Sequence, residues 1–148
     1  MLGRLYNGQV CSAARALEVV GERWSLLIIR NAMFAGMTRF TDFQRSLGIA
    51  PNVLTKRLAE FVEAGLFELK AGESGGYAEY VLTSKGLDLK PVIVALTEWG
   101  DRWAAPDGRP VTYEHDGCGG VVALKLECTS CAQALPFEDV RARVASWV

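Results

Sequence analysis

The apolar residues between positions 10 and 65 follow a helical period in four consecutive segments, and a glycine follows each segment. Apolar side chains at intervals of three and four residues line one face of a helix, which can then be buried. Glycine ends such a helix because it adopts left-handed backbone angles at little steric cost. The pattern predicts four short helices, which end at Gly21, Gly36, Gly48 and Gly65.

The third and fourth of these segments have the pattern of a helix-turn-helix. Thr38 can cap the third helix, which has apolar side chains at positions 40, 43 and 47. The fourth helix covers residues 49–64 and carries Pro51 in its first turn, where proline is favoured. Two short helices joined by a glycine-containing turn are typical of this motif when the second offers a polar N-terminal face.

The period changes from helical to strand-like after Gly65. Residues 66–70 and 77–82 are expected to form two strands, joined by a glycine-rich tip at residues 71–76. A β-hairpin directly after a helix-turn-helix is a wing. The sequence therefore predicts an α+β fold that is mainly α with a small β-hairpin, namely a winged helix-turn-helix followed by a small C-terminal ribbon.

A further helix is expected to begin at Thr83 or Ser84, and Pro91 kinks or restarts it. Its apolar ridge carries two tryptophans, more than a single solvated helix exposes. We expect this ridge to form a dimer interface, in preference to an effector pocket between subunits, with Leu96, Trp99 and Trp103 as its contacts.

A polar stretch with two prolines and a glycine follows that helix. We therefore expect a DNA-binding and dimerisation domain over residues 1–104 and a C-terminal extension over residues 110–148. Within the extension, the pattern predicts a hairpin through residues 121–126 and a short helix after Pro136.

Basic side chains concentrate in the helix-turn-helix region, although the whole chain is close to neutral. The chain has 16 basic and 17 acidic residues, whereas residues 23–57 contain six basic residues and one acid, a local charge of +5. Such a local excess is typical of a surface that binds phosphate. Arginines on solvated helix faces are the simpler alternative.

Several short motifs occur in order over residues 8–103. They are Cys11, Gly21-Glu22-Arg23-Trp24 with Leu27 and Ile28, Arg39-Phe40, Leu54-Thr55, Arg57-Leu58, Gly65-Leu66 and Glu79-Tyr80-Val81-Leu82-Thr83 with Gly86 and Trp99. Taken together they resemble the HxlR-type winged helix-turn-helix transcriptional regulators of bacteria. The resemblance implies a homodimer, built through its first and last helices, that binds a pseudo-palindromic operator in double-stranded DNA, with repression as the default.

The chain departs from the family pattern at three places. Ala50 stands where the family usually has a serine able to cap the fourth helix, a loss of about 1 kcal/mol. The wing tip carries Glu73 and no arginine, which argues against minor-groove contact by this wing. The C-terminal extension is present in only part of the family.

Five polar residues of the predicted helix-turn-helix are candidates for DNA contact. Amide and guanidinium groups can read base edges in the major groove or hold phosphates. Arg39, which opens the third helix, is expected to bind a backbone phosphate. The fourth helix offers the other candidates, Asn52, Thr55, Lys56 and Arg57. The alternative is an ordinary amphipathic helix pair with solvated ends.

Three of the four cysteines and the single histidine lie close together near the C-terminus. Two residues separate His115 from Cys118 and Cys128 from Cys131, and nine residues separate the two pairs. A two-residue gap lets both side chains of a tight turn converge on one ion, so this set predicts structural zinc in a ribbon-like extension. About 40 residues cannot bury much of a core, and a metal supplies the missing stability. A Cys128–Cys131 redox pair or disulfide, a regulatory metal sensor, and three buried thiols without a ligand are the alternatives.

Cys11 stands alone before the first helix. The family resemblance implies a sensor of oxidants or electrophiles, since some relatives use a cysteine at this place to switch DNA affinity, and Arg15 can lower the pKa of the thiol. We favour the simpler interpretation, in which Cys11 is a small buried side chain.

The sequence favours a DNA-binding regulator over an enzyme, because it has one histidine and neither an acid pair nor a nucleophile elbow. A protein-interaction adaptor that has lost DNA affinity is the rival, favoured by the acidic wing tip and the near-neutral total charge. A small-molecule effector is compatible with either function, but the sequence does not identify one. The longest stretch without Asp, Glu, Lys or Arg is ten residues, and about 20 apolar residues are needed to cross a bilayer, so we expect a cytoplasmic protein.

Overall fold

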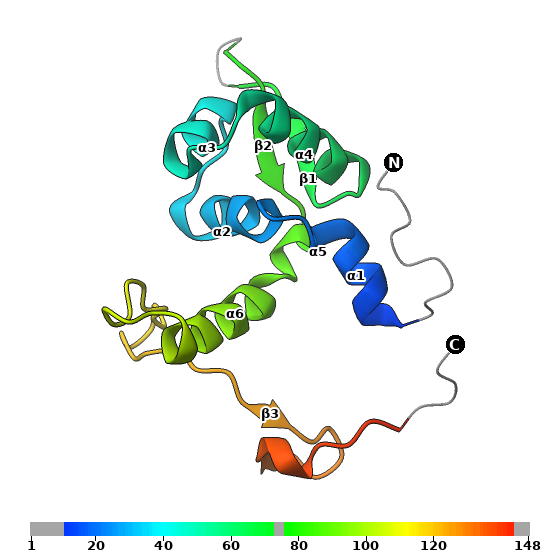
Figure 1. Ribbon diagram of the computed structural model, residues 1–148, viewed down its shortest axis with the longest axis vertical. Coiled ribbons are helices and arrows are strands. Elements are labelled where there is room, and N and C mark those ends of the chain that lie inside the picture. The colour runs from blue at the N-terminus through cyan, green and yellow to red at the C-terminus, as the bar shows by residue number, and fades with distance from the viewer. Residues whose placement is uncertain (1–10, 73–75, 144–148) are drawn as a thin grey trace. The chain divides into compact units, whose positions relative to one another are not determined.

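The computed structural model describes residues 11–72 and 76–143 of the chain (Figure 1). The chain divides into two compact units, of which the first ends at Lys90 and the second begins at Pro91. From the sequence we expect the boundary after residue 104, whereas this division assigns the long helix α6 (Lys90–Trp103) almost entirely to the second unit. None of the helices in the described part of the chain is long and apolar enough to cross a membrane.

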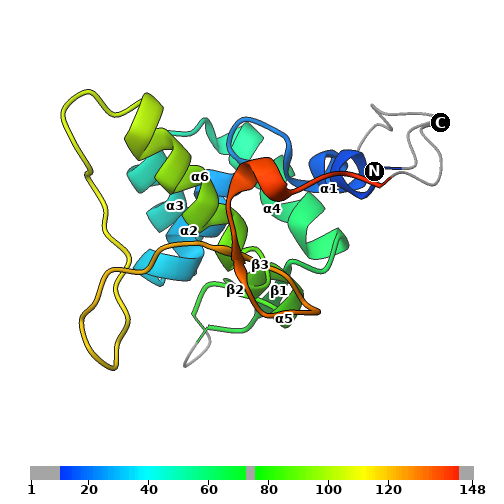
Figure 2. The same ribbon diagram turned by 90° about the horizontal axis from the view of Figure 1, so that it is seen from below.

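The first unit is a winged helix-turn-helix, as the sequence predicts. Strands β1 (Phe67–Lys70) and β2 (Glu79–Leu82) pair antiparallel and lie side by side in both views (Figure 2), with Phe67 opposite Leu82 and Lys70 opposite Glu79. The elements follow in the order α1 (Ser12–Val20), α2 (Ser25–Ala35), α3 (Phe40–Leu47), α4 (Pro51–Glu63), β1 (Phe67–Lys70), β2 (Glu79–Leu82) and α5 (Ser84–Leu87).

Glycine ends the middle helices for the expected reason. Gly36 and Gly48 both have φ of 62°, the left-handed conformation that favours glycine. Gly21 differs, because its φ of −76° is an ordinary helical value. Helix α2 begins at Ser25, whose N–H donates to Glu22 O across the preceding turn (2.9 Å).

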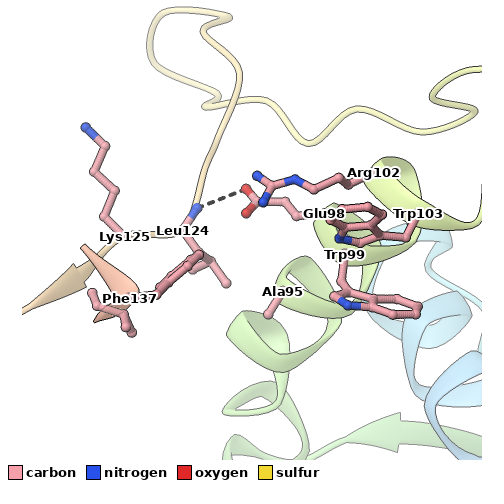
Figure 3. A pocket seen from close by; sticks show the side chains of 9 residues that line it. Ala95, Glu98, Trp99, Arg102, Trp103, Leu124, Lys125 and Phe137 are labelled. Carbon is pink, nitrogen blue, oxygen red and sulfur yellow. Dashed lines mark hydrogen bonds between the residues drawn. The ribbon is translucent and has the colours of Figure 1, made fainter. Parts of the chain in front are cut away.

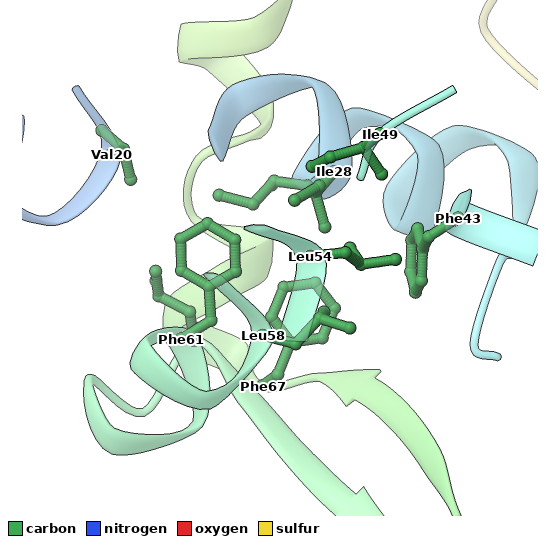
Figure 4. Close-up of a cluster of buried hydrophobic side chains, with 10 residues drawn as sticks. Val20, Ile28, Phe43, Ile49, Leu54, Leu58, Phe61 and Phe67 are labelled. Atoms are coloured by element: carbon green, nitrogen blue, oxygen red, sulfur yellow. The ribbon is translucent and has the colours of Figure 1, made fainter. Parts of the chain in front are cut away.

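The core of the first unit lies where α2, α3 and α4 meet β1 (Figure 4). Phe67 of β1 is at its centre. The ring of Phe67 stacks on Phe61 with centroids 5.7 Å apart and meets Phe43 edge to face at 6.5 Å. Helix α1 adds little to this core, since only its Val20 is buried and Leu17 is 48% exposed. Val10, which the pattern assigns to the same apolar face, lies outside the described residues.

Thr83 joins the end of the wing to the helices, as its predicted capping role requires. Its hydroxyl accepts from the Gly86 N–H (3.2 Å) and donates to Gly65 O (2.6 Å). A Cβ at position 86 would lie 2.4 Å from Leu66 O, so only glycine permits this close approach.

The helix restart predicted near Pro91 is confirmed, because α5 ends at Leu87 and α6 begins at Lys90.

The second unit contains α6 and a segment with little regular structure. The hairpin predicted through residues 121–126 is wrong. Val121 forms a single bridge with Glu114, while β3 (Leu126–Glu127) pairs antiparallel with β4 (Ala134–Leu135). The reason is that the chain turns at residues 115–120 and 128–133, around the predicted metal ligands, and not between them. The helix predicted after Pro136 is a single 3-10 turn, Phe137–Asp139.

The start of α4 lacks a side-chain cap, as the alanine at position 50 predicts. Ala50 has the extended backbone of an N-cap residue (φ −62°, ψ 136°), but no side chain accepts from the first N–H groups of the helix. Its carbonyl oxygen already accepts from the N–H groups of Val53 and Leu54, both at 3.0 Å. The backbone is therefore arranged for a capping side chain that the residue does not provide.

We predict that Ala50→Ser raises the free energy of unfolding by about 1 kcal/mol, because the hydroxyl can accept from a first-turn N–H group. Denaturant unfolding followed by circular dichroism measures the change. The matched control is Ala59→Ser, the same substitution at an exposed position inside α4, which is expected to lower stability slightly. Equal effects of the two substitutions would contradict the capping argument.

Candidate nucleic-acid interface

The turn between α3 and α4 fixes the direction in which α4 leaves α3. The Gly48 N–H donates to Gln44 O at 2.9 Å, which closes the end of α3. The next residue, Ile49, is 2% exposed and belongs to the core. A buried side chain directly after the left-handed glycine holds the turn in one conformation, so α4 has a fixed orientation on the unit.

Helix α4 has a buried face and an exposed polar face. Leu54, Leu58 and Phe61 are buried, each at 1% exposure or less. Asn52, Thr55 and Lys56, which we call the α4 face, are exposed at positions spaced three and four residues apart. The Thr55 hydroxyl donates to Pro51 O (2.9 Å), which leaves its oxygen lone pairs free to accept. The structure thus brings three of the predicted DNA contacts together on one exposed surface.

Arg57 does not belong to this surface, contrary to the sequence prediction. It is 6% exposed, and its guanidinium lies 2.7 Å from Glu60 Oε2 and 3.8 Å from Glu22 Oε2. Helical period gives the direction in which Arg57 leaves α4, but it does not reveal whether the guanidinium has a partner within the protein. The i, i+3 spacing to Glu60 was the available signal. We therefore assign Arg57 a structural role that ties α4 to the turn before α2.

Arg39 lies at the N-cap of α3 with an exposed side chain, as a phosphate contact requires. Its Nε donates to Glu79 Oε1 of β2 at 3.5 Å. An exposed pair of this length contributes about 1 kcal/mol or less, so a phosphate can replace the carboxylate. Arg39 stays a candidate for backbone contact.

Two further arginines of the first unit are exposed, and motif spacing alone does not single them out. Arg45 is exposed in the last turn of α3, and it forms no ion pair within the described residues. Arg23 is exposed before α2, with its guanidinium 5.0 Å from the centre of the Trp24 ring. Both belong to the +5 segment, so the local charge was the signal that contained them.

The wing contributes less charge than the helices. On β1, Lys70 Nζ lies 2.9 Å from Glu68 Oε1, so this lysine is already paired. Glu73, whose position at the tip argues against minor-groove contact, lies outside the described residues.

The C-terminal ligand candidates form two pairs. His115 Nδ1 lies 3.3 Å from Cys118 Sγ. Backbone N–H groups of Cys131 and Ser130 hydrogen-bond to the Cys128 thiol and, with the Cys131 side chain, lower its pKa. The alternative of three buried thiols is wrong, because Cys118 and Cys131 are exposed and Cys128 is partly exposed. In the part of the chain that the structure describes, no three His, Cys, Asp or Glu side chains lie close enough to hold one metal ion.

Cys11 is exposed at the N-cap of α1, so the expectation of a buried side chain is wrong. The backbone N–H groups of Ala14 and Ala13 lower the pKa of its thiol, because they stabilise the thiolate at the start of the helix. Arg15, the expected cause, lies 3.2 Å from Glu18 Oε1 and forms an ion pair with it.

The predicted dimer ridge on α6 is exposed within the second unit, with Leu96 at 49%, Trp99 at 61% and Trp103 at 70%. Both tryptophans also line a pocket of about 260 Å³ between α6 and residues 124–137 (Figure 3). Glu98 closes one side of the pocket, where its carboxylate accepts from the Leu124 N–H at 3.0 Å. The walls are mainly apolar, so the pocket suits an apolar group.

Comparison with known proteins agrees with this geometry. Residues 19–108 match the HxlR-like helix-turn-helix family. An uncharacterised HTH-type transcriptional regulator of Mycobacterium tuberculosis is 43% identical over 141 residues, which cover 94% of this chain and 87% of the relative. The similarity therefore includes most of the C-terminal segment.

Solved structures show the same fold. The crystal structure of PA1607, described as a transcription factor, has a TM-score of 0.81 and 41% sequence identity, and the match covers 90% of this chain and 94% of that chain. The reduced form of the redox regulator HypR has a TM-score of 0.57 and 27% identity, and covers 66% of this chain and 95% of that chain.

The buried ion pair gives a prediction about stability. Arg57→Ala leaves the carboxylate of Glu60, whose side chain is only 11% exposed, without its partner, so we expect the free energy of unfolding to fall by about 3 kcal/mol. The exposed neighbour provides the control, since Lys56→Ala should change stability by about 0.5 kcal/mol or less. Denaturant unfolding of both variants measures the difference. A loss for Arg57→Ala as small as that for Lys56→Ala would show that Arg57 is not a structural residue.

Proposed function

Since the chain belongs to the HxlR-like helix-turn-helix family of transcriptional regulators, we propose that it binds a pseudo-palindromic operator as a homodimer and represses transcription there. Regulators of this family bind DNA and commonly act as dimers. The observation that carries the proposal is the α4 face, a set of exposed polar side chains on a helix whose other side is locked into the core.

The α4 face has the chemistry for major-groove contact. Asn52 offers an amide that can pair with adenine, and Lys56 offers a cation for guanine or phosphate. Arg39 and Arg45 lie at the two ends of α3, the helix that precedes the turn, where backbone phosphates are the expected partners. Burial of Arg57 leaves Lys56 as the cation of the α4 face.

A dimer is supported by apolar surface that each unit leaves exposed. The ridge of Leu96, Trp99 and Trp103 is large and aromatic, which is typical of protein interfaces. In the other unit, Leu17 of α1 is also exposed. A two-fold dimer presents two copies of α4, so its operator contains two half-sites related by the same symmetry.

Cys11 is the proposed point of redox control. Its thiol is exposed and its pKa is lowered, so the thiolate that reacts with oxidants forms more readily than at an ordinary cysteine. The structural similarity to HypR, a redox regulator, supports this role. We propose that modification of Cys11, at the first residue before α1, changes the affinity of the regulator for its operator.

The adaptor remains the second candidate because several charges of the DNA-binding unit are neutralised internally. Arg57 pairs with Glu60, Arg39 with Glu79, and Lys70 with Glu68. An adaptor of this kind would bind bulk DNA weakly and without the salt dependence that phosphate contacts produce.

Salt-dependent binding to bulk DNA distinguishes the two functions. We expect the logarithm of the affinity to fall linearly with the logarithm of salt concentration, because phosphate contacts release counterions. Lys56→Ala should reduce that slope by about one for each chain in the complex, and hence by about two for a dimer. Fluorescence anisotropy with labelled duplex DNA measures both slopes. Lys125→Ala, which removes the same charge outside the helix-turn-helix, is the control. A wild-type affinity without salt dependence would support the adaptor and refute DNA binding.

The lowered pKa of Cys11 gives a prediction about pH. Thiolates, and not thiols, react with iodoacetamide, so the rate of Cys11 alkylation should reach half its maximum at a lower pH than in the same chain unfolded in denaturant, where the thiol has its ordinary pKa. Mass spectrometry of the modified peptide over a pH series measures this midpoint. The other three thiols of the Cys11→Ser variant report the background rate. A midpoint at or above the ordinary value would remove the basis for redox control at this residue.

A further inference from the structure

The first pair of ligand candidates lies in a turn with a defined hydrogen-bond pattern. The His115 N–H donates to Gly120 O at 2.9 Å, and the Gly119 N–H donates to His115 O at 2.8 Å. The first, fifth and sixth residues of the turn thus bond to one another and close residues 115–120 into a loop. His115 and Cys118, at its first and fourth positions, are the two donors that this loop holds.

The second pair lies in a turn with the same pattern. The Cys128 N–H donates to Gln133 O at 3.0 Å, and the Ala132 N–H donates to Cys128 O at 2.8 Å. Again the first, fifth and sixth residues close the loop, and the two donors, Cys128 and Cys131, occupy its first and fourth positions. The chain therefore builds one turn twice, with the donor side chains at equivalent positions.

The backbone after the second donor is left-handed in both turns. Gly119 has φ of 69° and Ala132 has φ of 55°. Among the described residues, Ala132 alone has a positive φ without being glycine. Because this conformation costs an alanine about 1 kcal/mol or more, it persists only where the surrounding structure demands it. Ala132 adopts this left-handed conformation at the position equivalent to Gly119. The two turns therefore have the same backbone geometry, which suggests the same role.

Within each turn the donor atoms converge. In the first turn, His115 Nδ1 lies 3.3 Å from Cys118 Sγ. Side chains at the neighbouring glycines would obstruct these donors, since a Cβ at Gly117 would lie 2.8 Å from His115 Cε1 and one at Gly120 would lie 3.3 Å from Cys118 Sγ. In the second turn, backbone N–H groups and the Cys131 side chain hydrogen-bond to Cys128. Each turn is therefore a preformed site for two ligands of one ion.

The segment that carries these turns lacks a core of its own. In the second unit only Ile93 and Val94 of α6 are buried among the described residues, and none of residues 104–143 is buried. A segment of this size needs a disulfide, a metal or a partner to hold it in one conformation. Of these three, the two matched pairs of zinc-type ligands favour a metal as the source of stability.

The connection between the turns allows them to meet. It covers residues 119–127, so nine residues separate the second donor of the first turn from the first donor of the second turn. In the present structure residues 122–125 form no regular element, and the Leu124 N–H is held by Glu98. Among the described residues no three ligand candidates share one site, so binding of one ion by all four requires residues 121–125 to change conformation and the Leu124–Glu98 hydrogen bond to be exchanged.

We propose that His115, Cys118, Cys128 and Cys131 of one chain together bind a single Zn²⁺ ion in a tetrahedral site that closes when the two turns meet. Four protein ligands leave no open coordination position, so the site is structural and supports no hydrolytic chemistry. The metal folds the C-terminal segment into a ribbon and completes the second unit.

The test uses the full-length protein, purified under reducing conditions, with metal content measured by atomic emission. We expect one zinc ion per chain, and one Co²⁺ ion per chain after exchange, with the visible absorption of a tetrahedral cobalt–thiolate complex. His115→Ala and Cys128→Ser should each lose the ion, whereas the control Cys11→Ser should keep it. Circular dichroism of each variant checks that the first unit stays folded.

A second pair of variants tests the turn without removing a ligand. Ala132→Gly relieves the left-handed strain and should keep one ion per chain, whereas Ala132→Val adds to that strain and should weaken Co²⁺ binding about tenfold. Either of two results would overturn the proposal. One is a fully reduced protein that takes up neither Zn²⁺ nor Co²⁺. The other is half an ion per chain, which would mean that two chains share one ion, or an ion retained in both ligand variants, which would mean that other residues hold it.

Discussion

The packing of α4 against Phe67 is the contact on which the rest of the DNA-binding unit depends. Phe61 stacks on the Phe67 ring from α4, and Phe43 meets the same ring from α3, so one strand residue joins both helices of the motif to the wing. This contact fixes the rotation of α4 about its axis. The rotation in turn decides that Lys56 faces solvent and that Arg57, one residue later, is buried. The DNA-binding surface is thus a consequence of core packing.

Local rules were sufficient to predict the first unit from the sequence. The left-handed glycines 36 and 48 end helices for reasons that act within a few residues, and the change of period after Gly65 marks the wing. The site needed more than local rules. Whether Arg57 binds phosphate or Glu60 depends on how closely α4 approaches the core. The helical period of the apolar residues does not report that distance. Cys11 shows the same limit, since its pKa is lowered by helix N–H groups and not by the nearby Arg15.

The conformation of the C-terminal segment could be predicted less well, because few of its side chains are buried and burial therefore fixes little of it. Its ligand spacing identified the two turns, but the predicted hairpin through residues 121–126 followed from strand preference, and the chain forms its pairs at the turns themselves. Where no side chain is buried, hydrogen bonds within short turns decide the local conformation. A bound metal would then supply the order that the helices of the first unit obtain from their core.

We propose that two copies of the α4 face recognise a symmetric operator. Selection of genomic DNA fragments by the purified protein tests it most directly, because it requires no knowledge of the target. We expect enrichment of a sequence with two-fold symmetry, whose half-sites lie one helical turn, roughly 10 base pairs, apart. The absence of any enriched sequence at low salt, where phosphate contacts are strongest, would contradict it.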